Sequence, residues 1–196
     1  MKIIIFTLVL LLSACESNQI YQKAQYKANI TDKYPVVSIV INDGLYSSPH
    51  QAHMYQGIVK SLRKANVFKR INVNSNTGNS FVFDIRVKEN SKNNFFSIMV
   101  FASTLGLIPV ENHRHFDMDV VILYKNSVIK KFHYSVDGIE LLHVGISFTA
   151  TIYQAMDSLI SYLLRDIEKE KVFEDTDILK KIKKREMEKI IYLPIV

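Results

Sequence analysis

Cysteine, proline and glycine are scarce in this chain of 196 residues, which has one, four and six of them respectively. The single cysteine excludes an intramolecular disulfide framework and any metal site built from several cysteines. So little glycine and proline excludes a collagen-like or low-complexity chain. Hydrophobic residues make up 48% of the sequence, which excludes a chain that is disordered throughout. The length that remains fits one globular domain with short appendages.

The amino terminus has the organisation of a secretory signal. Lys2 precedes an apolar stretch, residues 3–12, that is too short to cross a bilayer, because a spanning helix needs about 20 residues. The sequence Leu-Ser-Ala-Cys that ends at Cys15 resembles the bacterial lipobox. The resemblance implies cleavage before Cys15 and attachment of two or three acyl chains, which anchor a protein stably. The alternatives are an ordinary signal peptide or a short anchor helix with an incidental cysteine.

The residue after the lipobox cysteine bears on location. In lipoproteins of Gram-negative bacteria an aspartate there favours the inner membrane, so Glu16 implies the periplasmic face of the outer membrane. Removal of residues 1–14 deletes only Lys2, which leaves 24 basic against 19 acidic residues and a net charge of +5. A basic balance often indicates nucleic-acid binding, but a periplasmic address argues against it. We expect a membrane contact and an acidic or anionic envelope partner instead.

Catalytic signatures are absent from the sequence. It contains no Gly-x-Ser-x-Gly, no His-Glu-x-x-His, no P-loop and no glycine-rich dinucleotide fingerprint. Acylation of Cys15 would also remove the only cysteine nucleophile. We therefore expect a protein that is not an enzyme and binds no cofactor.

The pattern of apolar residues predicts an α+β domain over residues 34–172. It would follow a signal peptide (residues 1–14) and an acylated tether (residues 15–33), and precede a basic C-terminal helix or tail (residues 173–196). β-Branched and alternating runs predict strands at residues 34–41, 67–73, 81–88, 95–103, 116–124 and 128–136. Helical spacing predicts helices at residues 49–66, 148–171 and 177–191.

These elements predict a mainly antiparallel sheet of five or six strands with two helices packed on one face, plus the basic helix at the C-terminus. Residues 137–147 carry no prediction. The sequence does not indicate an oligomeric state.

Four residues of metal-ligating type, His113, His115, Asp117 and Asp119, occupy alternate positions that would share one face if the chain is extended there. Alternate residues share one face of a strand, and two imidazoles with two carboxylates suit zinc or another divalent ion. Neighbours on one face stand about 7 Å apart, so only adjacent pairs could chelate one ion. If the next strand pairs in even register, His133 lies opposite Asp119. We expect a solvated face with cross-strand His–Asp pairs rather than a metal site.

Two segments are candidates for partner binding. The connector at residues 104–110 is apolar, and Leu105, Leu107 and Ile108 are its candidate contact residues. An apolar loop is either tucked under a helix or exposed for a partner or a bilayer. The basic C-terminal helix supplies a second set of candidates, Lys180, Lys181, Lys183 and Lys184.

One stretch of the domain carries a family resemblance. Residues 36–73 run through a strand, an Asn-Asp-Gly loop, a helix capped by Ser48 and Pro49, and the sequence Leu-Arg-Lys-Ala-Asn-Val-Phe-Lys-Arg-Ile. This resembles small bacterial lipoproteins with the TolB amino-terminal-like α/β fold, including curli-secretion lipoproteins and activators of penicillin-binding proteins. Residues 101–109, Phe-Ala-Ser-Thr-Leu-Gly-Leu-Ile-Pro, look like uncharacterised members of such groups.

The resemblance implies an envelope scaffold or regulator and supplies no active-site residue. We expect a non-enzymatic accessory or scaffold subunit of a secretion, transport or peptidoglycan complex. The alternatives are a metal- or lipid-binding envelope protein, or a lipoprotein that neutralises a toxin.

Overall fold

A six-stranded mixed sheet forms the centre of the computed structural model, which describes residues 19–20, 24–29, 32–41, 49–74, 81–92, 95–142 and 149–174. The strands lie in the order β1-β6-β5-β4-β2-β3. Their bounds are β1 (Gln19–Ile20), β2 (Val37–Ile41), β3 (Ile71–Val73), β4 (Phe81–Lys92), β5 (Val110–Tyr124) and β6 (Ser127–Leu142). The pairs β1–β6, β6–β5 and β5–β4 are antiparallel, whereas β2 pairs in parallel with β3 and β4. The predicted α+β class is confirmed.

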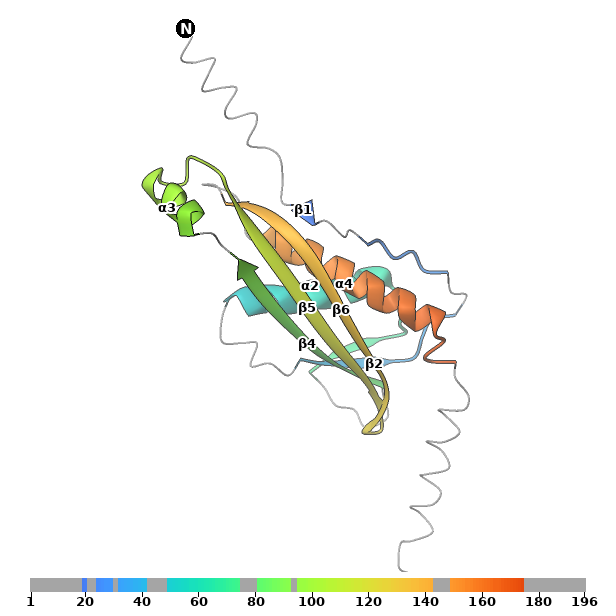
Figure 1. The fold of residues 1–196 in the computed structure, drawn as a ribbon. Coiled ribbons are helices and arrows are strands. Elements are labelled where there is room, and N and C mark those ends of the chain that lie inside the picture. The colour runs from blue at the N-terminus through green and yellow to red at the C-terminus, as the bar shows by residue number, and fades with distance from the viewer. Residues whose placement is uncertain are drawn as a thin grey trace, which may run out of the picture.

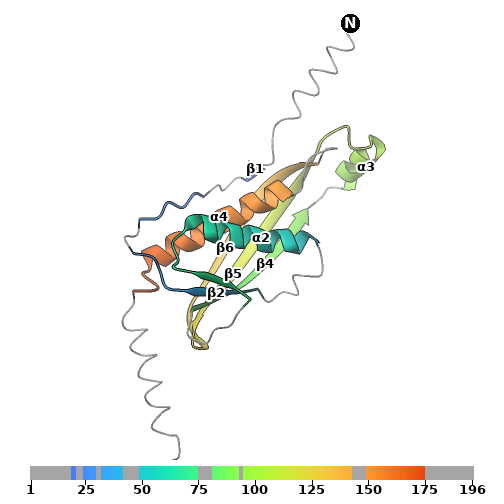
Figure 2. The same ribbon diagram turned by 180° about the vertical axis from the view of Figure 1, so that it is seen from behind.

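Two helices lie side by side on one face of the sheet (Figure 2). They are α2 (Pro49–Ala65) and α4 (Thr149–Lys169), and both begin and end within two residues of their predicted bounds. The opposite face, toward the viewer in Figure 1, carries none of the described helices. Antiparallel strands tolerate such one-sided cover when their outward residues are polar.

The core lies between the sheet and these two helices. The apolar stripe of α4 is fully buried against alternate residues of the long strands, as the period-2 and period-3.6 patterns require. The largest fully buried side chains of the core include Phe83, Phe116, Met118, Ile122, Ile152, Met156 and Leu159. An aromatic cluster closes one end, where the ring of Phe173 lies 5.0 Å from that of Tyr34 and 4.9 Å from that of Phe81.

The strand predicted at residues 95–103 is wrong, because this segment forms the helix α3 (Phe95–Ser103). A short run that is apolar on all sides has no period that separates helix from strand. The hydrogen bonds at the end of α3 are those of a helix cap. The backbone N–H of Gly106 donates to the carbonyl of Phe101 (2.7 Å) and that of Leu105 to Ala102 (3.2 Å), which together close the helix in a Schellman motif.

The strand β6 also differs from the prediction. It continues to Leu142, so six residues without a prediction, 137–142, belong to the sheet. Two parts of the segment expected as a tether lie on the domain. β1 pairs with β6, and the Tyr26 hydroxyl donates a hydrogen bond of 2.7 Å to Glu168 on α4.

Several predictions lie outside the described residues. These are the signal peptide, Cys15, Glu16 and the basic helix at residues 177–191 with Lys180, Lys181, Lys183 and Lys184. Within the described ranges, no helix combines the length and the apolar character needed to cross a membrane.

The close approach of α2 and α4 depends on Gly57, because a Cβ at this position would lie 2.8 Å from Met156 Cγ and 3.0 Å from Met156 Cβ. We expect Gly57→Val to lower the free energy of unfolding by about 2 kcal/mol. Combined with Met156→Ala, it should cost less than the sum of the two single changes, since the smaller residue makes room. Urea denaturation measures this, with the exposed Arg63→Ala on α2 as control. Additive effects would show that the helices do not meet at Gly57.

Candidate functional site

An apolar projection links β4 to β5. It consists of α3 and the connector that follows, residues 95–110, and we call it the α3 cap. The cap contains no charged residue. None of the residues of α3 is buried, and the exposed fractions of Phe95, Leu105 and Leu107 are 75%, 82% and 72%. The other exposed large side chains of the cap are Phe96, Ile98, Met99 and Ile108. An exposed apolar patch of this kind marks a contact with protein or membrane.

The position of the cap explains its exposure. The helix α4 begins level with the end of β6, where the Thr151 hydroxyl lies 3.4 Å from a carboxylate oxygen of Glu140. The α3 cap lies beyond the start of α4, at the end of the sheet. Both views show α3 projecting away from α2 and α4 (Figures 1 and 2). Neither described helix of the core therefore offers α3 a surface to pack on.

The last turn of α3 turns the connector outward. Leu105 has a φ of 52° and Gly106 a φ of 75°, both in the left-handed region. Glycine adopts this conformation readily, whereas leucine does so at a cost. The Thr104 hydroxyl closes the turn with a hydrogen bond of 2.8 Å to the carbonyl of Val100.

Sequence reasoning found part of this surface. Leu105, Leu107 and Ile108 were candidates, and the structure exposes all three, so the alternative of a connector tucked under a helix is wrong. Reasoning from the sequence missed Phe95, Phe96, Ile98 and Met99, because a strand apolar on both faces would be buried in the sheet. The signal available was the charge-free run that continues from residue 95 into the connector.

The open face of the sheet carries the predicted histidines and aspartates. The predicted register is confirmed, since Asp119 pairs with His133. His133 Nδ1 lies 2.8 Å from Asp119 Oδ1. His115 lies between two acids, with Nδ1 2.7 Å from Asp137 Oδ1 and Nε2 3.1 Å from Asp117 Oδ1. The contacts His133–Asp119 and His115–Asp137 join β6 to β5 as the cross-strand pairs expected of a solvated sheet face, and His115–Asp117 lies within β5.

The remaining candidate, His113, lies 3.6 Å from Glu111 on its own strand. In the part of the chain that the structure describes, no group of three or more histidine, cysteine, aspartate or glutamate side chains is arranged to hold a metal ion. The acids on this face are instead neighbours of basic side chains, since Asp117 pairs with Lys88 and Asp119 with Arg86 across the β4–β5 ladder.

A buried charged cluster lies on the other face of the same strands, beneath the start of α4. Arg114 donates hydrogen bonds to Glu89 (2.9 Å) and Glu140 (2.7 Å), and Asn112 donates to Glu140 at 3.2 Å. The side chains of Arg114 and Glu140 are 5% and 1% exposed. Burial raises the pKa of Glu140, while the charge of Arg114 opposes that rise. The cluster closes the core at the end nearest the α3 cap.

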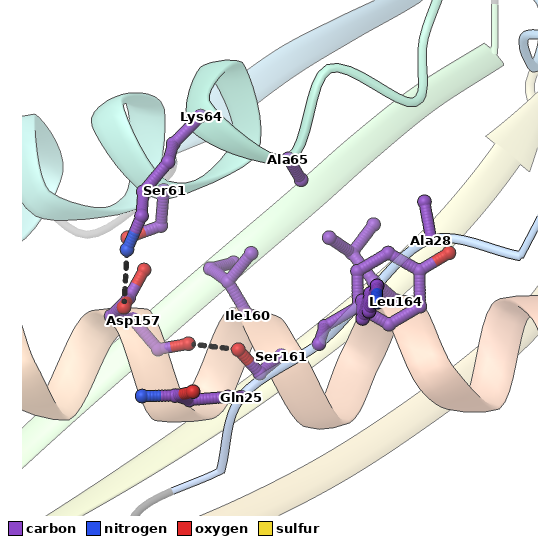
Figure 3. Close-up of a pocket in the computed structure, with 11 residues that line it drawn as sticks. Gln25, Ala28, Ser61, Lys64, Ala65, Asp157, Ile160, Ser161 and Leu164 are labelled. Atoms are coloured by element: carbon purple, nitrogen blue, oxygen red, sulfur yellow. Dashed lines mark hydrogen bonds and ion pairs between the residues drawn. The ribbon is translucent and has the colours of Figure 1, made fainter.

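A cleft of about 390 Å³ lies between α2, α4 and residues 25–28. Figure 3 shows its polar wall, where Lys64 Nζ lies 3.0 Å from Asp157 Oδ2 and the Ser161 hydroxyl donates to the carbonyl of Asp157. Lys64 and Asp157 thus form an exposed ion pair on this wall, and Lys27 is a further cationic residue of the lining.

Comparisons with known proteins concern the fold. No protein-family model and no curated protein matches the sequence. Among solved structures, rare lipoprotein B from Shewanella oneidensis matches at 11% identity over 69% of this chain and 98% of that chain, with a TM-score of 0.40. A minor lipoprotein from Acinetobacter baumannii matches at 10% identity over 70% and 95%, with a TM-score of 0.40. A PelC dodecamer from Paraburkholderia phytofirmans matches at 13% identity over 74% and 95%, with a TM-score of 0.38. In fold the chain is similar to these three solved structures, with identities of 13% or less and TM-scores of 0.40 or less.

The paired histidine on the open face predicts a pH dependence. The hydrogen bond to Asp137 is the largest cause that raises the pKa of His115, with the charge of Asp117 adding to it and partial burial opposing it. A raised pKa stabilises the fold below the ordinary value of about 6.5, and this stabilisation is lost as the pH rises through the folded-state value. The stability difference between the wild type and Asp137→Asn should therefore be larger at about pH 5.5 than at about pH 8.5. Ser135→Ala, on the same face, is the control for urea denaturation, and an equal difference at both pH values would contradict the pairing.

The buried cluster predicts an unequal response to two substitutions. Arg114→Met leaves the buried carboxylate of Glu140 and the partly buried carboxylate of Glu89 without their cation and should cost about 3–5 kcal/mol of unfolding free energy. Glu140→Gln should cost less, because Arg114 keeps Glu89 as a partner. The exposed Arg86→Met is the matched control, with an expected cost below about 1 kcal/mol. Equal costs for Arg114→Met and Arg86→Met in chemical denaturation would mean that the cluster contributes nothing.

Proposed function

We propose that this protein is a lipid-anchored envelope protein that acts by binding, as a non-enzymatic accessory or scaffold subunit of a cell-envelope complex. The observation that carries the proposal is the exposure of the α3 cap, a charge-free surface that the described part of the domain leaves uncovered. Exposed apolar area is unfavourable in water, so a stable protein keeps it where another apolar component covers it.

The anchor in this proposal is Cys15. The lipobox-like sequence that ends at this residue supports acylation, and Glu16 supports sorting to the periplasmic face of the outer membrane. The membrane would then be one component that the protein contacts, and an envelope protein the other.

Binding agrees better than catalysis with the chemistry of the described residues. Catalytic acids and bases are held in sheltered sites that shift their pKa values. Here His115 and His133 lie on an open sheet face in pairs with aspartates, and the buried Arg114 and Glu140 hold each other. Such pairs stabilise a surface and a core without leaving a group poised for chemistry.

Two regions would receive the protein partner. One is the open face of the sheet, with its alternating acidic and basic residues, which suits an interface rich in polar contacts. The other is the basic segment with Lys180, Lys181, Lys183 and Lys184, which lies outside the described residues and favours an acidic partner.

Affinity purification from crosslinked cells tests the proposal. We expect the wild-type protein to capture a defined set of envelope proteins from the outer-membrane fraction and the Cys15→Ala variant to lose most of them, because anchoring concentrates the domain at its partner. Charge reversal at Lys180, Lys181, Lys183 and Lys184 should weaken this capture. Glu16→Asp is the matched control for sorting, and it should move the anchored protein toward the inner membrane. A wild-type protein that captures the same set as Cys15→Ala would contradict the proposal.

A further inference from the structure

The strand β1 fixes where the anchored end of the chain meets the domain. It pairs antiparallel with β6, with Gln19 opposite Ile139 and Ile20 opposite Gly138. Because β6 runs toward the end of the sheet that bears the α3 cap, β1 runs away from that end. Gln19, the first residue of β1, is therefore the end of β1 nearer to the cap.

The distance along the sheet is short. Ile139 pairs with His113 of β5, three residues after Val110, where the cap ends. Three strand residues span about 10 Å. Cys15 precedes Gln19 by four residues, a chain length that reaches at most about 14 Å. An acyl group on Cys15 is thus confined by covalent reach to the end of the domain that carries the cap.

The apolar character of the α3 cap favours contact with the hydrocarbon of a lipid bilayer over docking in a groove of a partner protein. Phe96 and Ile98 are two residues apart and therefore lie about 160° from each other around the axis of α3, and both are exposed. The half-buried Phe101 extends the apolar surface farther round the helix. A helix that docks in a protein groove needs apolar residues on one face only, whereas a helix that is apolar all round is covered on all sides. Leu105, Leu107 and Ile108 extend the same surface beyond the helix.

The length of α3 limits how far it can enter. Its nine residues span about 14 Å, less than half of the hydrocarbon core of a bilayer, which is about 30 Å thick. The cap can therefore lie within one leaflet but cannot cross the membrane. Lys92 is exposed at the end of β4, at the edge of the cap, where a cation is attracted to lipid headgroups. Glu111 is also exposed, on the neighbouring strand β5.

We propose that the α3 cap inserts into the leaflet that holds the acyl chains of Cys15, so that the domain is attached to the membrane at two points. This inference rests on the proposed function, because it needs the acylated anchor. Its basis in the structure is the juxtaposition of the exposed cap with the entry point of β1. The occupant is the lipid bilayer itself, not a protein groove or a second copy of the chain.

The absence of tryptophan from the sequence permits a direct test. Phe95→Trp and Leu107→Trp each place one fluorophore in the cap, and Val128→Trp places one at the far end of the sheet, where Val128 is also an exposed apolar residue. All three positions are exposed, so the substitutions should leave the fold intact. The acylated full-length mature protein is reconstituted into vesicles of phosphatidylethanolamine and phosphatidylglycerol, with and without lipids brominated along their acyl chains.

We expect brominated lipid to lower the emission of Phe95→Trp and Leu107→Trp by about twofold or more, with emission shifted to shorter wavelength, as for aromatic side chains buried in a leaflet. The Val128→Trp variant should keep the emission of a water-exposed indole and show no quenching. Quenching in the two cap variants alone would support insertion of the cap.

Three other outcomes overturn the inference. Cap variants that emit as in water and are not quenched would leave the cap outside the leaflet. A shift to shorter wavelength without quenching, lost on dilution of the protein in the vesicles, would assign the cap to a second copy of the chain. Equal quenching of Val128→Trp would show general adsorption of the domain. The intact mass of the purified protein reports acylation separately, so an unacylated Cys15 would overturn the proposed function together with this inference, whereas acylation without quenching overturns the inference alone.

Discussion

The burial of α4 on the sheet is the interaction on which the rest of this structure depends. The helix spans 21 residues, about 31 Å, whereas β5 spans 15 residues, about 50 Å. The helical layer therefore cannot cover the whole length of the long strands. Where α4 begins, Thr151 and Glu140 mark the limit of the covered area. Anything that the chain places past that limit must find cover outside the helical layer.

The residues on the two sides of this limit of the covered area differ in charge. On the inner side, Arg114 pairs through its two terminal guanidinium nitrogens with Glu89 and Glu140, since a buried charge is tolerated only with hydrogen-bonded partners. On the outer side, the chain carries no charge between residues 95 and 110. A segment that ended the fold in water would be polar, and so the contrast supports the proposed role of the α3 cap as a contact surface.

Sequence reasoning recovered the elements whose periodicity is unambiguous. The helices α2 and α4 and the β5–β6 hairpin follow from their patterns, and the register that sets Asp119 opposite His133 follows from alternation alone. It failed at α3, since an apolar run without a period fits a buried strand as well as an exposed helix. It also passed over the buried cluster, although Arg114 shares the parity of Phe116 and Met118 and so had to face the core. The periodicity of apolar residues predicts helices and strands. It does not predict which of their surfaces stay exposed once the helices have packed on the sheet.

In the attachment proposed above, the direction of β1 brings the acylated Cys15 to this exposed end. Had β1 paired in parallel with β6 at the same residues, the chain from Gln19 toward Cys15 would run toward the middle of the sheet, and the proposed acyl chains would lie away from the cap. A single flexible attachment leaves a domain free to rotate about its tether. Two attachments at one end remove most of that freedom, so that the long strands lead away from the leaflet. The open face of the sheet would then stand in a fixed orientation, and a partner would meet its charged rows at a higher effective concentration than on a freely turning domain.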